Sequence, residues 1–597
     1  MERNDNLLGY IDGSTNATTQ RFEVVLADHA VVQLDDLVVV RQTLADGSGE
    51  LTHFGIVVEG VGLIEGARLA SDTQRICGTK TMPGQRVRKI VVQILRVDPE
   101  RWMPPLPGAR AELARGVQRE MALFQDRMEE NRLALGLDHL DEPVYVDWSF
   151  FNGDKGGHLS ISGISGVATK TSYALFALYM LLETDAGRRL LGNYVGRTKA
   201  VVFNVKGEDL LHIDRPNRKF EGDARAREMW AALGVDNPQP FRSVRLFVPP
   251  LPGAGDGPLA ARVGHRRDSE YTIYGWTPVE FVRRGLLQYV FADAREQNQV
   301  SFVVEHVRAL LARHAVASST HPGAVILKAY PVAGRGRDFE RASDLLNRAA
   351  AEPEEPGDTV IEDFSDLISA LEDRFDDNLG APWASARLAP ATIDAFLRRL
   401  IAMSRRMGHL VNRQARTLEL SDTVNVVDIH SLHDDAQRFV VGSLLDQVWQ
   451  EKQTGGREPL RFIVLDELNK YAPREGRSPI KEMLVDIAAR GRSLGVILVG
   501  CQQNAGRVES TIVDNASIKV VGRLDASHAD DYKFLSAELR QRAVRFLPGT
   551  MVIDQPVVPA PIPIVFPFPP YATNVAEDPI GANDMPAGID PVDQVAP

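Results

Sequence analysis

The 597-residue sequence has little of what marks secreted or membrane-spanning proteins. It contains two cysteines, Cys77 and Cys501, which are too few for a disulfide framework or an all-cysteine metal site and which suit a reducing compartment. It has no apolar run of about 18 residues, and its first residues lead into no apolar signal segment. We therefore expect a cytoplasmic protein with no membrane segment.

Charge is unevenly distributed along the chain. The net charge is −12, but positions 351–378 hold eleven acidic residues and one arginine, and positions 574–597 hold five acidic residues and no basic one. The rest of the chain is close to neutral or slightly basic, so the global balance does not exclude nucleic acid as a partner. Hydrophobic residues at 44% and charged residues at 25% are typical of a globular chain, and the length predicts more than one domain.

The hydrophobic pattern divides the chain into segments. Short strands separated by turn residues such as Gly62 predict a small β-barrel over positions 1–108, followed by a helical linker at 109–143. Strands then alternate with amphipathic helices at 144–209 and 420–555, which predicts an α/β core with a parallel sheet covered on both faces. A mainly helical insertion at 210–419 interrupts this core.

The C-terminal segment 556–597 is rich in proline. Proline cannot donate to a strand ladder, so we predict an extended tail without a central strand, and its composition predicts disorder for the last 24 residues.

A loop of small residues between a strand and an apolar helix is the first candidate site. The run from His158 to Ser172 ends its loop with Lys170 and Thr171, the arrangement in which backbone N–H groups wrap phosphates, a lysine reaches their oxygens and a hydroxyl binds Mg²⁺. The spacing is irregular, because Thr169 replaces the usual glycine before the lysine. An ordinary strand–turn–helix connection is the alternative. The candidate nucleotide-binding residues are Gly163, Ser165, Gly166, Val167, Ala168, Thr169, Lys170, Thr171 and Ser172.

Two further strands end in chemically useful side chains. The apolar run 461–465 is followed by Asp466, a candidate Mg²⁺ ligand with Thr171, and Glu467, a candidate general base. The run 496–501 ends at Gln502. Ligands bind at the carboxyl ends of strands in open α/β sheets, so Lys170, Asp466 and Gln502 are expected to converge in one crevice. The three motifs together predict an NTPase that uses ATP and Mg²⁺.

Arg492 closes an amphipathic helix between the last two motifs. It can simply complement the helix dipole. The alternative is that its guanidinium reaches the γ-phosphate bound by a neighbouring subunit, which would make the enzyme an obligate oligomer.

This assembly resembles the HerA branch of the HerA/FtsK superfamily of hexameric DNA-translocating ATPases. The resemblance rests on VVFNVKGE at 201–208, FIVLDE at 462–467, ARGRSLG at 489–495 and GCQQN at 500–504. It implies a RecA-like P-loop NTPase core, with Lys170 and Thr171 on phosphate and Mg²⁺, Asp466 and Glu467 as the Walker B pair, Gln502 as sensor and Arg492 acting in trans. Glu208 matches the family's acid near the nucleotide.

The resemblance also implies partners and a role. We expect a homohexamer that encloses DNA, most simply duplex DNA bound without sequence specificity, and that translocates or unwinds it. A NurA-like nuclease, or a sirtuin-like or other effector, would act with it in DNA end processing, repair or anti-phage defence. The alternatives are a scaffold ATPase that assembles and activates such a nuclease or effector, and a conjugation or chromosome-transfer ATPase.

Two other patterns have weaker interpretations. Arginines at 398–416, in a helical stretch, are candidates to line a ring pore, although a basic helix face is more often simply solvated. Asp428, His430 and His433 resemble a metal site, but without further ligands at suitable spacing they are better explained as a strand end and a helix cap.

Overall fold

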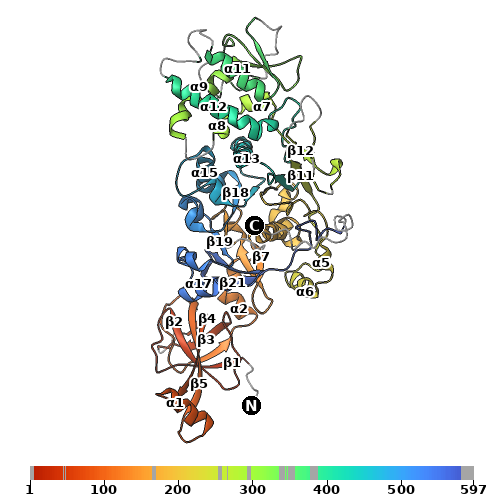
Figure 1. Ribbon diagram of the computed structural model, residues 1–597. Helices are drawn as coiled ribbons and strands as arrows, with labels where there is room; N and C mark the ends of the chain where they lie inside the picture. Colours follow the sequence, from red (N-terminus) through yellow and green to blue (C-terminus); the bar gives the residue numbers. More distant parts are fainter. Residues whose placement is uncertain are drawn as a thin grey trace. The chain divides into compact units, whose positions relative to one another are not determined.

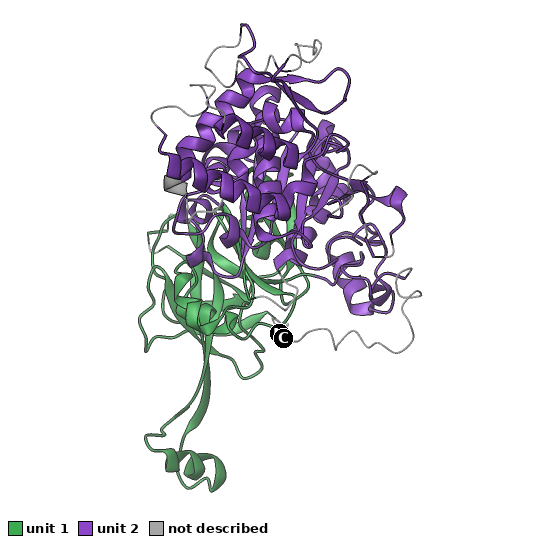
Figure 2. Cartoon of the chain, turned by 45° about the horizontal axis from the view of Figure 1, so that its top comes forward, with its two compact units in different colours: residues 1–150, 162–169, 517–566 green, residues 151–161, 170–516, 567–597 purple. Residues whose placement is uncertain are grey.

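A computed structural model describes most of the chain. The described residues are 6–44, 46–47, 49–164, 170–252, 259–261, 263–264, 266–291, 297–334, 340, 343, 346, 356–376, 383 and 388–579. The chain divides into two compact units, coloured separately in Figure 2. Unit 1 comprises 1–150, 162–169 and 517–566, and unit 2 comprises 151–161, 170–516 and 567–597. Each unit is built from segments that are distant in sequence.

Unit 1 begins with the predicted β-barrel. Six antiparallel strands close in the order β1-β2-β5-β4-β3-β6. Their bounds are β1 Leu7–Ile11, β2 Arg21–Leu26, β3 Leu37–Thr43, β4 Glu50–Glu65, β5 Gln85–Asp98 and β6 Arg110–Leu113. Alternate residues such as Phe22 and Val24, or Val38 and Val40, fill the barrel interior. The expectation of a barrel at the start of the chain is confirmed.

The barrel corrects two local predictions. Gly62 is not a turn, because β4 continues through it and pairs it with Arg88 of β5. The segment 109–143 is not a helical linker. It contains β6, which pairs with both β1 and β3, one short helix α2 (Val117–Ala122), and the strand β7 (Arg132–Leu137). Strand β6 supplies backbone hydrogen-bond partners to the free edges of both β1 and β3 when it closes the barrel. This pairing overrides the local helical pattern.

Strands β4 and β5 continue beyond the barrel as a hairpin, which we call the arm and define as residues 59–91. Its base at 89–91 still pairs with β2, so the part with only two strands runs from Gly62 with Arg88 to Glu65 with Gln85. Register pairs run from Glu59 with Val91 to Glu65 with Gln85. Its tip holds α1 (Ala70–Thr73) and the π-helical turn η1 (Gln74–Gly78). Figure 2 shows the arm as a narrow ribbon projecting from the rest of unit 1.

The remaining strands of unit 1 lie in the order β19-β20-β21-β7-β8. Their bounds are β19 Ile518–Val521, β20 Thr550–Gln555, β21 Val558–Val565 and β8 Pro143–Asp147. Strand β21 contradicts the prediction that the tail contains no central strand, since it pairs with β20 along most of its length and with β7 at Val565. Pro559, Pro561 and Pro563 occupy alternate positions of β21. The backbone nitrogens that lack a hydrogen therefore all lie along one edge of the strand, and the N–H groups along its other edge remain available as donors.

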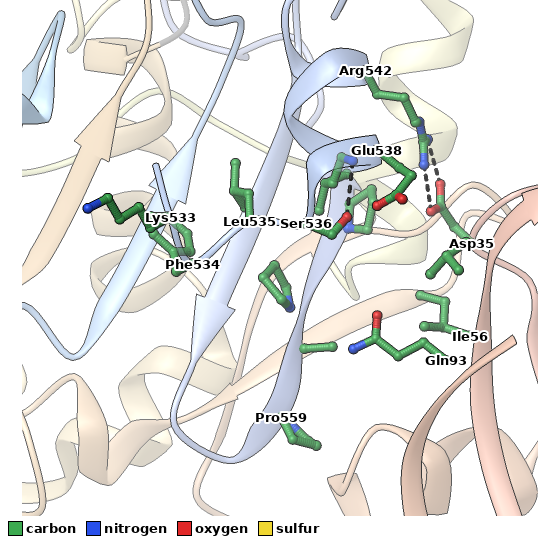
Figure 3. A pocket seen from close by; sticks show the side chains of 15 residues that line it. Asp35, Ile56, Gln93, Lys533, Phe534, Leu535, Ser536, Glu538, Arg542 and Pro559 are labelled. Carbon is green, nitrogen blue, oxygen red and sulfur yellow. Dashed lines mark hydrogen bonds and ion pairs between the residues drawn. The ribbon is translucent and has the colours of Figure 1, made fainter. Parts of the chain in front are cut away.

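A pocket of about 280 Å³ lies within unit 1 between barrel strands, β21 and the helix α17 (Ala537–Ala543) (Figure 3). On its rim Arg542 donates two hydrogen bonds to Asp35, Nη1 to Oδ1 at 2.8 Å and Nη2 to Oδ2 at 2.7 Å. This bidentate ion pair ties α17 to the loop before β3.

Unit 2 contains the predicted α/β core. Its strands lie in the order β12-β11-β16-β10-β17-β18-β9. Their bounds are β9 Leu159–Ser162, β10 Lys199–Asn204, β11 Val244–Val248, β12 Thr272–Ile273, β16 Val424–Asp428, β17 Arg461–Leu465 and β18 Val496–Gln502. The pairs of β10 with β16, β10 with β17 and β17 with β18 are all parallel. Every residue of β16, β17 and β18 is buried, as expected for a sheet covered on both faces.

Helices of the core are shown in Figure 1. Helix α3 (Lys170–Leu182) is buried almost all round, and α13 (Asp434–Gly455) packs against α15 (Pro479–Leu494). Shorter helices are α4 (Asp185–Leu191), α14 (Leu468–Tyr471) and α16 (Ser510–Asp514). The predicted α/β core with a parallel sheet, preceded by a β-barrel, is confirmed.

The insertion at 210–419 is mainly helical, as predicted. It contains α5 (Arg218–Glu221), α6 (Ala224–Ala232), α7 (Pro278–Arg283), α8 (Leu287–Val290), α9 (Gln297–His314), α11 (Phe364–Asp376) and α12 (Pro390–Met407). Helix α12 packs against α9, α11 and α13. The insertion also provides β11 and β12 to the parallel sheet and a separate three-stranded sheet, β13 (Ala315–Ala317), β14 (Val325–Leu327) and β15 (Thr359–Ile361).

The first part of the predicted disordered end is packed into unit 2. Glu577 and Asp578 are buried, and Arg215 Nη1 donates to Asp578 Oδ2 at 2.7 Å. Charge pairing with residues about 360 positions earlier holds this segment, a contact that composition alone does not reveal. Residues 580–597 lie outside the described part of the chain. Among the described helices, none is both long and apolar enough to cross a bilayer.

Candidate nucleotide site

The predicted site residues of unit 2 lie at one edge of its parallel sheet. Strand β17 ends one residue before Asp466, β18 ends at Gln502, and β10 ends at Asn204. These strands are parallel, so their carboxyl ends lie at the same edge. Strand β9 runs in the same direction, because His158 accepts a hydrogen bond from Leu498 and Ser160 from Gln502. The three predicted motifs therefore end at one edge of the sheet, as chain order and strand direction predicted.

Lys170 and Thr171 are the first residues of α3. The Thr171 Oγ1 donates a hydrogen bond to Asp466 Oδ2 at 3.1 Å. Lys170 is buried, and burial lowers the pKa of its ammonium, while the carboxylate of Asp466 opposes that shift. A buried cation, a hydroxyl and a carboxylate thus meet at the amino terminus of a helix, where an anion is also favoured.

Other members of the candidate phosphate loop are placed differently. Gly163 directly follows β9 and belongs to unit 1, where the backbone N–H of its neighbour Ile164 donates to Arg523 O at 2.9 Å. Ser172 is the third residue of α3 and is half-buried. The loop residues Ser165, Gly166, Val167, Ala168 and Thr169 lie outside the described residues.

Glu467 has an unusual backbone conformation. Its φ of 54° and ψ of 44° are left-handed, and it is the N-cap residue of α14. The left-handed region of φ and ψ gives a glutamate no local stabilisation, and few residues other than glycine adopt it. Its own N–H donates to Asp466 Oδ1 at 2.8 Å. The turn therefore holds the two acids side by side in a conformation that the rest of the fold must impose, as is common at functional sites.

Lys206 is the residue of this site that sequence reasoning missed. Its Nζ lies 2.9 Å from Glu467 Oε1 and 3.6 Å from Asp466 Oδ2. Burial alone would lower its pKa, but the two carboxylates outweigh this and raise it. The signal was present in the sequence: Lys206 follows the apolar run that ends at Asn204, and β10 lies next to β17. A cation just past a strand end faces the acids that end the adjacent strand.

Gln502 is fully buried and held in place. Its Nε2 donates to the hydroxyl of Ser160 at 2.7 Å. The preceding Cys501 is also buried, and burial raises the pKa of its thiol well above the usual value. The Cys501 thiol donates to the carbonyl oxygen of Lys170 at 3.9 Å. These contacts connect the end of β18 to both β9 and the start of α3.

Asn204 and Glu208 flank Lys206 in the sequence, two residues before it and two after it. The Asn204 Nδ2 donates to Asp428 Oδ1 at 2.8 Å, so the asparagine joins β10 to the end of β16. Glu208 Oε2 lies 3.9 Å from His212 Nε2. A methyl group at Gly264 would come within 2.6 Å of the same carboxylate.

Arg492 does not join this group in its own chain. It lies in the last turn of α15, four residues before β18 begins at the amino-terminal edge of the sheet. It is exposed, and its Nη1 donates to Lys155 O at 3.4 Å. The side chains of Lys170, Asp466 and Gln502 lie at the opposite, carboxyl-terminal edge.

The aspartate and histidines at 428–433 have the structural roles that we predicted. Strand β16 ends at Asp428, whose carboxylate contacts His430 Nδ1 at 2.7 Å, and this hydrogen bond raises the pKa of His430. His433 is the N-cap of α13, and its Nδ1 accepts from the N–H of Asp435 at 3.2 Å.

No family model and no curated protein sequence matches the chain. Solved structures do. VirB4 of Thermoanaerobacter pseudethanolicus aligns with 15% identity and a TM-score of 0.42, over 73% of this chain and 97% of that chain. The bacterial conjugative coupling protein TrwB, lacking its first 70 residues, aligns with 11% identity and a TM-score of 0.42, over 77% and 93%. TrwB in complex with the ATP analogue ADPNP aligns with 11% identity and a TM-score of 0.42, over 75% and 94%. Because identities and TM-scores are this low, function is inferred from the site itself.

Proposed function

We propose that this protein binds ATP with Mg²⁺ and hydrolyses it. The observation that carries the proposal is the hydrogen bond between Thr171 and Asp466, with Lys170 buried beside it and Glu467 next in sequence. Hydroxyl and carboxylate oxygens are the ligands that Mg²⁺ prefers, and a lysine at a helix amino terminus suits phosphate. The donor set therefore fits Mg²⁺-ATP.

Each residue has a distinct task in this reaction. Lys170 binds the β- and γ-phosphate oxygens and stabilises the charge that develops on them. Thr171 and Asp466 hold the Mg²⁺, which neutralises phosphate charge when bound. Glu467 accepts a proton from water and orients it for in-line attack. Gln502, whose amide is held by Ser160, ends β18 at the same edge of the sheet and is proposed as the sensor of the nucleotide state.

The finer assignment is a ring-shaped DNA translocase or helicase of HerA type, acting as a homohexamer with a nuclease or effector partner. Its support is the family resemblance of the motifs together with the position of Arg492. An exposed arginine at the edge of the sheet opposite the nucleotide cannot act on its own subunit's phosphate, but it is available to a neighbouring subunit. Glu208 is proposed as a further acid near the nucleotide, as in the family.

The experiment compares three variants in steady-state ATPase assays. Lys170→Ala should reduce both nucleotide binding and turnover, and Glu467→Gln should keep binding but lower turnover by about 100-fold or more, because the amide is a poor base. Glu482→Gln, an exposed glutamate in the first turn of α15, is the matched control and should resemble the wild type. Unchanged turnover in both site variants would refute the proposed site.

The scaffold alternative is separated from the motor by one further measurement. A motor should show ATPase activity that duplex DNA stimulates. A scaffold should assemble with its partner when nucleotide is added, without stimulation by DNA. A conjugation or chromosome-transfer ATPase would also be stimulated by DNA but would act with a membrane-bound partner.

A further inference from the structure

The arm of unit 1 carries a concentration of basic residues. Over 59–91 the sequence has six basic and three acidic residues in a chain whose net charge is −12. One of the three acids, Asp72, is buried and accepts hydrogen bonds from the N–H groups of Arg68 and Leu69, so it serves as a cap for the tip. The distal half of the arm is therefore a cationic element on an acidic protein.

Four of these cations are exposed at or near the tip: Arg68, Arg75, Lys80 and Arg86. The side chain of Arg75 is 64% exposed, and its nearest acid, Asp72, lies 4.0 Å away. The two other basic residues are engaged by the barrel. Arg88 donates to the carbonyl oxygens of Ala27 and Asp28, and Lys89 forms an ion pair with Asp12.

One face of the arm carries two glycines beside larger side chains, namely Ile64, Arg86, Arg88 and Ile90. Directly opposite residues of an antiparallel pair share a face, so Gly60 and Gly62 of β4 lie on the same face as Arg86 and Arg88 of β5. A methyl group at either glycine would meet no atom within 4 Å. Glycines in a strand often mark close approach by another backbone. Here they leave room beside two arginines.

The dimensions of the arm suit duplex DNA. Two paired strands lie about 4.8 Å apart, and the major groove, about 12 Å wide, admits a two-stranded ribbon, whereas the minor groove at about 6 Å does not. The part of the arm with only two strands, Gly62–Glu65 paired with Gln85–Arg88, spans roughly 13 Å at about 3.3 Å per residue. A cationic ribbon of this length can follow a groove and neutralise several phosphates.

Three arginines of the helical insertion are already engaged in contacts. Arg406 forms an ion pair with Asp435, and Arg413 Nε donates to Glu362 Oε2 at 2.9 Å. Arg398 Nε donates to the carbonyl oxygen of Asp394 at 3.2 Å. These contacts favour the arm over the 398–416 arginines as a phosphate-binding surface.

We propose that the arm is a duplex-DNA contact, with Arg68, Arg75, Lys80 and Arg86 binding backbone phosphates and the glycine face of the ribbon lying against the groove. This inference deepens the proposed function, on which it rests, by assigning the surface that DNA touches. The contact reads no base sequence, because its cations are long, mobile side chains that reach phosphate charge.

The test measures binding of a random-sequence duplex of about 30 base pairs by fluorescence anisotropy, between about 50 and about 200 mM salt. The arm variant carries Arg68→Ser, Arg75→Ser, Lys80→Ser and Arg86→Ser. The slope of log affinity against log salt concentration should be smaller in magnitude than that of the wild type by about 3 to 4. Each lost phosphate contact removes close to one unit of this slope.

A control variant carries four substitutions in exposed arginines of the barrel and its flanks, Arg21→Ser, Arg101→Ser, Arg110→Ser and Arg115→Ser, and should keep most of the wild-type slope. ATPase activity without DNA should be the same in all three proteins, which tests the nucleotide site separately.

An unchanged slope in the arm variant would overturn the proposal, as would a wild-type protein that binds no duplex at the lowest salt. The arm variant could instead keep DNA binding but lose self-association or binding to an acidic protein. That result would assign the arm to a protein partner and would also overturn the proposal. Absence of ATPase activity in the wild type would instead refute the proposed function.

Discussion

The hydroxyl of Thr171 donates to the carboxylate of Asp466 across 295 positions of sequence. Thr171 is the second residue of α3, and Asp466 follows the buried strand β17. The hydrogen bond brings two separate sequence motifs together, and under the proposed function these two oxygens would be ligands of Mg²⁺.

This pair predicts a difference between two substitutions at one position. Thr171→Val keeps the branched shape of the side chain but removes the hydroxyl, and should lower ATPase turnover by about 10- to 100-fold through weakened Mg²⁺ binding. Thr171→Ser keeps the hydroxyl and should stay within a few-fold of the wild type. Turnover measured against Mg²⁺ concentration checks this, and a valine variant with wild-type Mg²⁺ dependence would contradict the assigned ligand.

Lys206 supplies the second prediction. Its ammonium lies between two carboxylates that otherwise repel each other, so Lys206→Met should disturb the position of Glu467. We expect turnover to fall by about 10-fold or more, with partial recovery in Lys206→Arg, which keeps the charge.

Lys219→Met, at an exposed lysine of α5, is the control for loss of a positive charge in unit 2. Equal activity of Lys206→Met and Lys219→Met in steady-state assays would show that the contact with Glu467 has no catalytic role.

Ser160 is expected to act as a positioning residue through Gln502. Ser160→Ala removes the acceptor of the Gln502 amide, whereas Ser160→Thr retains a hydroxyl. Ser160→Ala should lower kcat several-fold and leave the KM for ATP nearly unchanged, because the amide is misplaced rather than lost. Gln502→Ala should have the larger effect on kcat. A change in KM alone, or no rescue by threonine, would argue for a purely structural role.

His158 gives a prediction about pH. Burial lowers the pKa of this histidine from 6.5 to about 4, and its Nδ1 accepts from the N–H of Leu498 at 2.9 Å. The unfolded chain therefore binds a proton between those pKa values and the folded chain does not. The stability that depends on neutral His158 is complete above pH 6.5 and is lost as the pH falls towards 4, by about 2 kcal/mol at about pH 5.

His158→Asn tests this linkage with little disturbance, because asparagine tolerates the positive φ of 67° and its side-chain oxygen can accept the same hydrogen bond. The thermal midpoint of the variant should fall less between neutral pH and about pH 5 than that of the wild type. Equal falls in the two proteins would contradict the assignment to His158.

Local pattern was sufficient to predict the strands of the α/β core and the side chains that end them. Apolar runs ending at Leu465 and Gln502 predicted buried strands, and both are fully buried in the parallel sheet. Because parallel strands place their carboxyl ends at one edge, the meeting of Lys170, Asp466 and Gln502 followed from chain order and strand direction. The helix beginning at Lys170 was equally clear from its apolar run.

Prediction from pattern was wrong where a distant partner decides the structure. Strand β6 forms because it closes the barrel between β1 and β3, although its surroundings suggested a helix. Strand β21 forms because its prolines remove N–H donors along only one edge of the strand, and β20 pairs with the other edge. Asp578 is buried because Arg215 neutralises it, which overrides a composition typical of disorder.

The amino-acid sequence by itself determined which side chains end the strands of the core, since hydrophobic periodicity and chain order are local properties. Only the tertiary structure decided that Lys206 lies against Glu467, that Arg492 lies at the opposite edge of the sheet, and that Gly60 and Gly62 continue a strand into the arm. Each of these depends on which strands become neighbours, and that choice is made by burial and edge pairing over the whole unit rather than by any short stretch of residues.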